Sequence, residues 1–560
     1  MSYLVGVECL DCGQRSAYDP RLAACPACGG PWLEARYDLV AAKSSLLTPA
    51  IGIGGLWRYQ GLLPVREIPP ALPMGEGGTP LLPATNLGLM LGLTRLFIKD
   101  ERRGPTGSFK DRQAAVTVAA LREAGLTDAV VASTGNVALA YAAYCARVGI
   151  RLWAFLTSLV PGAKMQEAAV YGTQVIKVTS TYDHAKQLAA TFARERGYYF
   201  DRGPMSVASL ESMKTIAFEM AEQLAASLGA PTPMVAPDWY VQAVSGGLGP
   251  LGVQKGFTEL RAMGLIDRVP SVAVIQTAGC SPMVRAWRSG ERTAQPVVSP
   301  TTRIFTLSTG DPGRNYTVLR ERVADGGGTF EDVSDDEAYR AVRLLAEVEG
   351  ISAEPAAGVA FAGLVKLAHA GVLKPDEIVV VNCSGHAMPV EESVLGPEWY
   401  RDLALPPAMS AVEGSEGSAR ETPEEGLLAA LSSLDRRLVR DVLVVDDHPE
   451  ARMLIRRILR SNGDFQIREA DSGREALSAA ATQRPDLIVL DLMMPEMDGF
   501  AVLDALRQRR ETASVPVVVV TAKELTPQER RSLEGRISRL MTKGEFLSED
   551  LLGEIGRVLD

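Results

Sequence analysis

The chain has 560 residues, a formal net charge of −10 at pH 7 and a hydrophobic fraction of 46%. This length allows three or four domains, and the apolar fraction is sufficient for a large core. The excess of negative charge, with no basic stripe, argues against a nucleic acid as partner. We expect no membrane partner, because the sequence has no recognisable signal peptide and no apolar run of roughly 18–20 residues.

Four of the seven cysteines lie near the start of the chain, as Cys9-x-x-Cys12 and Cys25-x-x-Cys28. This spacing lets both sulfurs of a pair face one metal ion, and four thiolates complete a tetrahedral zinc site without an open position. We therefore predict a zinc ribbon over residues 1–40 with a structural Zn²⁺. A ribbon that has lost its metal and a pair of redox dithiols are the alternatives. The scattered remaining cysteines favour a cytoplasmic location over a disulfide framework.

Residues 41–408 alternate apolar strand-like runs, such as 129–132 and 239–244, with Ala-rich helical runs. This alternation predicts an α/β fold with parallel sheets. Gly, Ser, Glu and Pro then dominate, so we predict a flexible acidic linker over 409–438. A second α/β pattern follows over 439–560, which indicates a separate domain.

The most informative segment runs from Pro105 to Arg112 with the sequence P-T-G-S-F-K-D-R. It follows a strand-like run that ends at Lys99, and Ala- and Val-rich helical sequence comes after it. A lysine at such a strand-to-helix turn is well placed to lose solvent, which lowers its pKa and frees its amine to form a Schiff base. We therefore predict that Lys110 is a catalytic lysine.

Two further loops follow predicted strands. The turn Ser133-Thr134-Gly135-Asn136 precedes an Ala-rich helix, where free backbone N–H groups face an anionic ligand. The glycines of the loop from Ser245 to Gly249 let backbone amides approach a phosphate. This loop also satisfies G-x-G-x-x-G, and a dinucleotide site is the alternative. Because Gln276 stands at the end of the next strand, where such a site expects an acidic residue, we favour a phosphate loop.

The octet around Lys110, these two loops and Asn382-Cys383-Ser384-Gly385-His386 together resemble the threonine synthases, which are fold-type II enzymes dependent on pyridoxal 5′-phosphate (PLP). The resemblance covers roughly residues 1–395. It implies a tryptophan-synthase-β-like fold, in which two parallel-sheet α/β subdomains follow the zinc ribbon. It also implies a homodimeric carbon–oxygen lyase that converts O-phospho-L-homoserine and water to L-threonine and phosphate.

The same resemblance implies a role for each site residue. Lys110 would hold PLP and act as the base, and Asn136 would bond the ring hydroxyl of the cofactor. Ser384 would contact the pyridine nitrogen. His386 could serve as a base, but because a lysine already fills that role we favour a positioning or structural histidine. The cofactor phosphate would bind to Ser245, Gly246, Gly247, Leu248 and Gly249. The amino-acid substrate would contact Ser133, Thr134 and Lys214, with Glu354 nearby.

Three segments depart from the threonine synthase pattern, at 206–209, 245–249 and 387–390. The first and third lie on the substrate side, so the identity of the substrate is less secure than that of the cofactor. A related α,β-eliminase or β-replacement enzyme, such as a threonine dehydratase, is one alternative. A signalling protein whose PLP module senses a ligand is another.

In the last domain, buried strand-like runs end at Asp446-Asp447 and at Asp491. Carboxylates at the ends of neighbouring parallel strands meet in one crevice, and three of them make an oxygen-rich Mg²⁺ site. The pattern closely resembles a response-regulator receiver domain with a flavodoxin-like (CheY-like) fold. The resemblance implies that Asp491 accepts a phosphoryl group, that Thr521 switches and that Lys543 pairs with the phosphate.

The resemblance further implies a histidine kinase or a phosphotransfer protein as a partner. Leu540 and Gly544 occupy positions where receivers usually have an aromatic residue and a proline, so the output switch can differ from that of the family. A receiver that serves only for docking, without phosphorylation, is the alternative.

Overall fold

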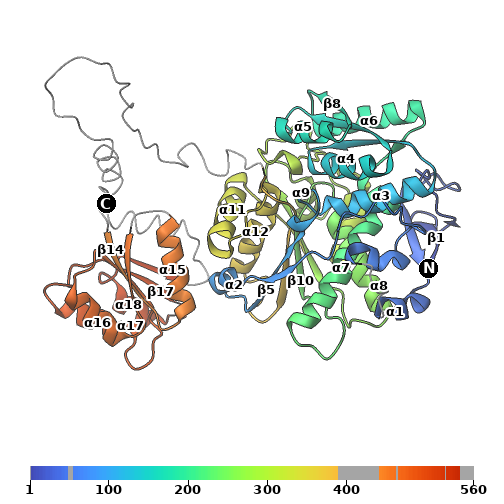
Figure 1. Ribbon diagram of the computed structural model, residues 1–560. Helices are drawn as coiled ribbons and strands as arrows, with labels where there is room; N and C mark the ends of the chain where they lie inside the picture. Colours follow the sequence, from blue (N-terminus) through green and yellow to red (C-terminus); the bar gives the residue numbers. More distant parts are fainter. Residues whose placement is uncertain are drawn as a thin grey trace, which may run out of the picture. The chain divides into compact units, whose positions relative to one another are not determined.

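The structure is a computed structural model that describes residues 2–47, 54–388, 440–461, 465–521, 523 and 525–542 (Figure 1). The chain divides into two compact units between residues 388 and 440. The linker predicted over 409–438 and the boundaries at 408 and 439 lie outside the described residues. No helix among those residues is long and apolar enough to cross a membrane.

The chain begins with a small three-stranded antiparallel sheet of order β2-β1-β3. Gly13 and Gly29 follow the two cysteine pairs, and both have a φ of 72°, a conformation that favours glycine. Their N–H groups bond the carbonyls of Cys9 and Cys25 at 2.9 Å, which closes two tight knuckles. The elements of this region are β1 (Leu4–Cys9), β2 (Arg15–Ser16), β3 (Leu33–Tyr37) and α1 (Leu39–Leu47).

The first parallel sheet has the order β8-β7-β6-β9. Its helices are rich in alanine, and the small side chains let them pack closely on apolar strands. The strands are β6 (Asp128–Ser133), β7 (Arg151–Thr157), β8 (Gln174–Val178) and β9 (Tyr199–Phe200). The helices are α3 (Lys110–Glu123), α4 (Asn136–Val148), α5 (Gly162–Val170) and α6 (Tyr182–Arg196).

The second sheet has the order β12-β11-β10-β13-β5-β4, and only the edge strand β4 is antiparallel to its neighbour. Its strands are β4 (Leu81–Pro83), β5 (Arg95–Asp100), β10 (Trp239–Ala243), β11 (Ser271–Thr277), β12 (Thr329–Val333) and β13 (Ile378–Cys383). Its helices are α2 (Thr85–Leu91), α7 (Val207–Ser227), α8 (Leu248–Ala262), α9 (Pro282–Arg288), α10 (Arg314–Asp325), α11 (Asp335–Glu349) and α12 (Pro355–His369). Short 3₁₀ turns occupy Gly55–Leu62, Glu101–Arg103, Gly203–Met205 and Phe305–Leu307. The two mainly parallel sheets confirm the predicted pair of α/β subdomains.

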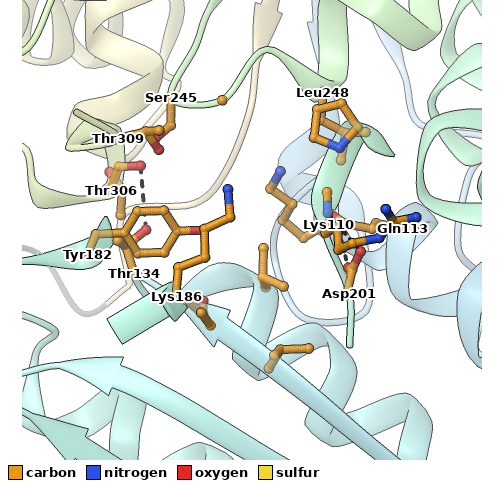
Figure 2. A pocket seen from close by; sticks show the side chains of 18 of the residues that line it. Lys110, Gln113, Thr134, Tyr182, Lys186, Asp201, Ser245, Leu248, Thr306 and Thr309 are labelled. Carbon is orange, nitrogen blue, oxygen red and sulfur yellow. Dashed lines mark hydrogen bonds between the residues drawn. The ribbon is translucent and has the colours of Figure 1, made fainter. Parts of the chain in front are cut away.

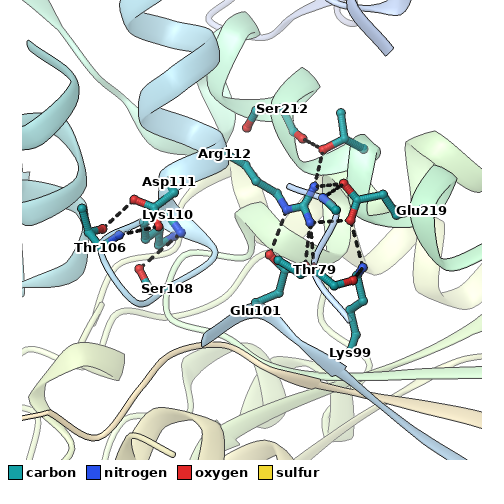
Figure 3. Close-up of polar contacts among 12 residues, drawn as sticks. Thr79, Lys99, Glu101, Thr106, Ser108, Lys110, Asp111, Arg112, Ser212 and Glu219 are labelled. Atoms are coloured by element: carbon teal, nitrogen blue, oxygen red, sulfur yellow. Dashed lines mark hydrogen bonds and ion pairs between the residues drawn. The ribbon is translucent and has the colours of Figure 1, made fainter. Parts of the chain in front are cut away.

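A buried charge network joins α3 to α7 beside the Lys110 turn (Figure 3). The guanidinium of Arg112 bonds Glu101 at 2.8 Å and Glu219 at 2.7 Å, and the amine of Lys99 bonds Glu219 at 2.9 Å. All four side chains are at least 95% buried. Arg112 and Lys99 outweigh the effect of burial and hold the pKa of Glu219 well below its usual value. Charges this deep are tolerated only because they are paired.

We expect Arg112→Met to lower the unfolding free energy of the N-terminal unit by about 3–5 kcal/mol, because it leaves Glu101 and part of Glu219 uncompensated in the core. The control is Arg103→Met, since Arg103 is 69% exposed and 3.6 Å from Asp100, and surface pairs contribute about 0–1 kcal/mol. Scanning calorimetry measures both variants. Equal melting temperatures for them would contradict a stabilising role of the network.

The C-terminal unit is a five-stranded parallel sheet of order β15-β14-β16-β17-β18, which confirms the flavodoxin-like fold. Its apolar strands form one core with the facing helices. The strands are β14 (Arg440–Val445), β15 (Phe465–Ala470), β16 (Leu487–Leu490), β17 (Val517–Thr521) and β18 (Arg539–Thr542). The helices are α15 (Pro449–Ser461), α16 (Gly473–Thr482), α17 (Gly499–Gln508) and α18 (Pro527–Leu533).

Candidate active site

Two adjoining cavities, of about 120 and 90 Å³, lie where the predicted loops of the N-terminal unit converge. Lys110, Thr134 and Ser245 line both of them, and Figure 2 shows these residues around the larger cavity. Parallel α/β sheets bind ligands at the carboxyl ends of their strands. The loops that follow β6, β10 and β13 all reach this site, so residues 250 positions apart in the sequence share one space.

Lys110 is the first residue of α3. Its turn is held against the loop after β13, since the N–H of Phe109 bonds the carbonyl of Ser384 at 3.0 Å and Ser108 bridges to Gly385. Burial lowers the pKa of Lys110 to about 8, against the opposing charges of Asp201 and Glu354. A pKa in this range leaves a substantial neutral fraction near pH 7, which a nucleophile or base requires.

The loop from Ser245 to Gly249 has the geometry of an anion cradle. Gly247 has a φ of 87° and precedes α8, and the start of that helix lines the smaller cavity. The first N–H groups of a helix have no partner within it, so a helix start next to a cavity suits an anion. A side chain at Gly249 would collide with Gln242, with its Cβ only 2.4 Å from amide atoms. A cradle of N–H groups at a helix start fits a phosphate.

Two residues outside the motifs hold this loop in place. The hydroxyl groups of Ser245 and Thr309 are 2.5 Å apart, and the amide of Asn315 donates to the carbonyl of Gly246 at 3.0 Å. The sequence analysis missed both Thr309 and Asn315. They lie in a segment without a strand or a glycine motif, so no local signal marks them.

Asn136 and Ser384 bind opposite oxygens of one carboxylate. Asn136 Nδ2 donates to Glu354 Oε2 at 2.7 Å, and Ser384 Oγ donates to Glu354 Oε1 at 2.9 Å. A side chain at Gly385 would meet the same carboxylate at 2.6 Å, so only glycine leaves room there. These donors, together with Lys110 and the cradle, form a set that fits PLP.

Ser133 and Thr134 both line the larger cavity. Ser133 Oγ also accepts the N–H groups of Gly135 at 2.9 Å and Ala138 at 3.1 Å, so it helps to start α4. Their predicted role towards a substrate carboxylate stays a prediction. His386 agrees with the structural interpretation, because its Nδ1 accepts the N–H of Met388 at 3.0 Å.

The structure corrects the prediction for Lys214. This residue lies in α7 with no exposed surface, and its amine pairs with Glu211 at 2.7 Å and Glu259 at 2.9 Å. It also lies 3.7 Å from the centre of the Tyr37 ring. Lys214 is not among the residues that line either cavity. A lysine fixed in the core by two carboxylates does not contact substrate.

Lys186, not Lys214, is a lysine that lies where a substrate could contact it. It is half-buried on α6, and it reaches into the larger cavity as Lys110 does (Figure 2). Its amine forms no hydrogen bond or ion pair with any of the residues that the structure describes. Asp201 lines the same wall, but its carboxylate already accepts from Gln113 and Tyr141, both at 2.6 Å. Lys186 is therefore a cation whose amine is open to a ligand. Arg202 also lines this cavity, but its guanidinium donates to the carbonyls of Ala23 and Met205.

The four ribbon cysteines meet at one point, with all their sulfurs within 4.8 Å of one another. Cys9 and Cys28 are 3.6 Å apart, and Cys12 and Cys25 are 3.7 Å apart. A tetrahedral Zn²⁺ with Zn–S bonds of about 2.3 Å requires sulfurs about 3.8 Å apart. The thiolate set therefore fits zinc.

In the receiver unit, Asp446 follows β14 and Asp491 follows β16, whose ends pair at Val445 and Leu490. Asp446 and Asp491 are almost fully buried, and Thr521 is completely buried at the end of β17. Asp446, Asp447 and His448 form a cluster that could hold a metal ion; the sequence analysis did not include the histidine. Lys543 and Gly544 lie outside the described residues.

Residues 72–385 match the family described as pyridoxal-phosphate dependent enzyme. The chain belongs to that family. Residues 442–554 match the response regulator receiver domain, so an enzyme and a receiver are joined in one chain. The family implies PLP as the cofactor, and the matched range includes the residues that surround Lys110.

The relatives agree with this assignment. Threonine synthase from Methanosarcina acetivorans is 33% identical over 390 residues, which are 70% of this chain and 93% of that protein. Threonine synthase from Methanocaldococcus jannaschii is 34% identical over 68% of this chain and 92% of that protein. The chain is thus a PLP-dependent lyase of the threonine synthase type. Among solved structures, maize serine racemase is 20% identical, with 55% of this chain and 87% of that chain covered and a TM-score of 0.47.

Proposed function

We propose that the enzyme converts O-phospho-L-homoserine and water to L-threonine and phosphate. The observation that carries the proposal is a further cation in the cavity besides Lys110. Lys186 is available beside Lys110, and the substrate has a phosphate in addition to the carboxylate and the amine of an amino acid. The similarity to threonine synthases over most of the N-terminal unit supports the same reaction.

The residues around Lys110 would hold the cofactor as follows. The N–H groups of Ser245 to Gly249 would take its phosphate, while Asn136 and Ser384 would take the ring hydroxyl and the ring nitrogen. PLP, when bound, draws electrons away from the α-carbon of an amino acid attached to it, which makes the α-proton acidic.

Lys110 is the group that would move protons. Once its amine is free and neutral, it can take the α-proton, and a further proton is lost from the β-carbon before phosphate leaves the γ-carbon. Water then adds at the β-carbon, and protons return to the α- and γ-carbons. Asp201 places a fixed negative charge near Lys110, which stabilises the ammonium form that results.

We expect Lys186→Met to raise KM for O-phospho-L-homoserine roughly 10- to 100-fold with a small change in kcat, because a charged hydrogen bond contributes about 1.5–3 kcal/mol. Inhibition by inorganic phosphate should weaken by a similar factor. The control is Lys177→Met, since Lys177 is exposed on β8 and does not line the cavity. An unchanged KM in the Lys186 variant would remove this residue from the substrate site.

An assay of the products tests the reaction itself. Purified protein incubated with O-phospho-L-homoserine should release phosphate and form threonine in equal amounts. A threonine dehydratase would instead release ammonia and a 2-oxo acid from threonine. A ligand sensor would change its cofactor spectrum with an amino acid but form no product. Either of these results would overturn the proposal.

We further propose that Asp491 is phosphorylated by a histidine kinase or a phosphotransfer protein. Asp446, Asp447 and Asp491 would hold the Mg²⁺ that neutralises the incoming phosphoryl charge. Thr521 would act as the switch residue, and Lys543 would pair with the phosphate. We also propose that the four-cysteine site binds a structural Zn²⁺ and that the protein is a homodimer.

A further inference from the structure

Helix α10 is attached at both ends to the N-terminal ribbon. At its first residue, Arg314 forms an ion pair with Asp11, which lies inside the first cysteine pair. Towards its last turn, Arg322 forms an ion pair with Glu34 of β3. Burial alone would raise the pKa of Glu34, but Arg322, Lys255 and Arg36 hold it below its usual value. The ribbon therefore fixes α10 through paired charges, one of them almost fully buried.

The same helix also touches the proposed phosphate cradle. Asn315, the residue after Arg314, donates to the carbonyl of Gly246 at 3.0 Å. Leu319 packs so closely that a Cβ on Gly247 would lie 3.2 Å from it. Arg322 also donates to the carbonyl of Leu251 in α8 at 3.2 Å. The position of α10 thus determines where the cradle lies.

A second connection runs through α8, the helix whose first residues, Leu248 and Gly249, belong to the cradle. Its Lys255 donates to the carbonyl of Ala35 in β3 at 2.7 Å and pairs with the fully buried Glu211. Tyr37 of the same strand lies against Lys214 and Lys255. Separating a buried pair leaves an uncompensated charge in the core, so these contacts resist movement of α8 away from β3.

We propose that the ribbon positions the cofactor-phosphate cradle, through α10 and α8, and that a metal-loaded ribbon raises the affinity of the enzyme for PLP. Asp11 and Glu34 are positioning residues, because they act through Arg314 and Arg322 and do not touch the cavity. When the four thiolates lose their metal, the first knuckle loosens, Asp11 releases α10 and Asn315 no longer holds Gly246. This inference does not depend on which amino acid is the substrate.

The first test measures PLP binding, by absorbance and fluorescence titration of cofactor-free protein, in Asp11→Asn and Arg314→Gln. Each variant should bind PLP roughly 2- to 5-fold more weakly, the range for a partly exposed ion pair. The double variant should bind PLP no more weakly than the single variant with the lower affinity, since the two substitutions remove the same ion pair. The matched control is Arg21→Gln, which breaks a ribbon contact to the carbonyl of Ala124, away from α10 and both cavities.

The second test uses the metal alone. Wild-type protein stripped of zinc by a chelator should bind PLP more weakly than zinc-loaded protein, and the metal should bind more tightly, by the same factor, when PLP is present. Circular dichroism and melting temperature show whether stripped protein and variants are folded. The inference would be overturned if the folded Asp11→Asn and Arg314→Gln variants bound PLP as tightly as the wild type. It would also be overturned if Arg21→Gln lost as much PLP affinity as these two variants. Neither test measures turnover, so a failed reaction assay leaves this result unaffected.

Discussion

Lys110→Ala is expected to lose both covalently attached PLP and turnover. The amine is the proposed attachment point and the proposed base, and a general base alone contributes about 10²–10⁴-fold in rate. The wild-type protein should be yellow, borohydride should bleach its visible band, and a peptide map should locate the reduced cofactor on Lys110. Lys186→Met serves as the control, because it should keep the cofactor attached. Cofactor on another lysine would contradict the assignment.

Lys110 should also make the rate of PLP uptake depend on pH. Burial lowers the pKa of Lys110 to about 8, so the neutral amine that reacts with PLP is the minor form below pH 8 and the major form above it. The rate at which cofactor-free protein takes up PLP should rise about tenfold per pH unit below 8 and level off above it. Asp201→Asn removes an opposing charge and should move the midpoint to lower pH. A midpoint near 10 would contradict the buried environment.

Asp491→Asn is expected to abolish phosphorylation of the receiver unit. In the wild type, a small phosphodonor such as acetyl phosphate with Mg²⁺ should label one site, because the carboxylate of Asp491 lies beside the acidic end of β14. Mass spectrometry or a phosphate-affinity gel measures the label. Asp498→Asn is the control, since Asp498 is an exposed aspartate that caps α17. Label that persists in the Asp491 variant would place the acceptor elsewhere.

Phosphorylation of Asp491 should also change the substrate affinity or the oligomer size of the enzyme. Coupling between two sites of one protein typically amounts to about 1–3 kcal/mol, or roughly 5- to 150-fold in affinity. We therefore expect beryllofluoride, which mimics the phosphoryl group, to change substrate affinity or oligomer size in the wild type and not in Asp491→Asn. If both proteins respond alike, the receiver does not act on the enzyme through Asp491.

The sequence alone determined the turns of this protein. The octet at Lys110, the glycines of the cradle and the two cysteine knuckles are local patterns, and each needs only a few neighbouring residues to adopt its conformation. The strands also follow from the sequence, because runs such as 378–381 are apolar throughout and both faces of a parallel sheet are covered. These patterns identified the fold and the cofactor region.

Only the tertiary structure decided which side chains face the cavity. Lys214 and Lys186 both lie on helices, and each has an acidic residue three positions earlier, Glu211 and Asp183, so this local pattern does not distinguish them. Glu259, which pairs with Lys214 in addition to Glu211, is 45 residues away in the sequence. The amine of Lys186 forms no hydrogen bond or ion pair with the described residues, although its charge acts on the Asp183 carboxylate. In the same way, Asn315 reaches Gly246 across 69 residues. Helical periodicity shows which face of a helix is buried but not which distant segment it meets, and that contact decides the role of each lysine.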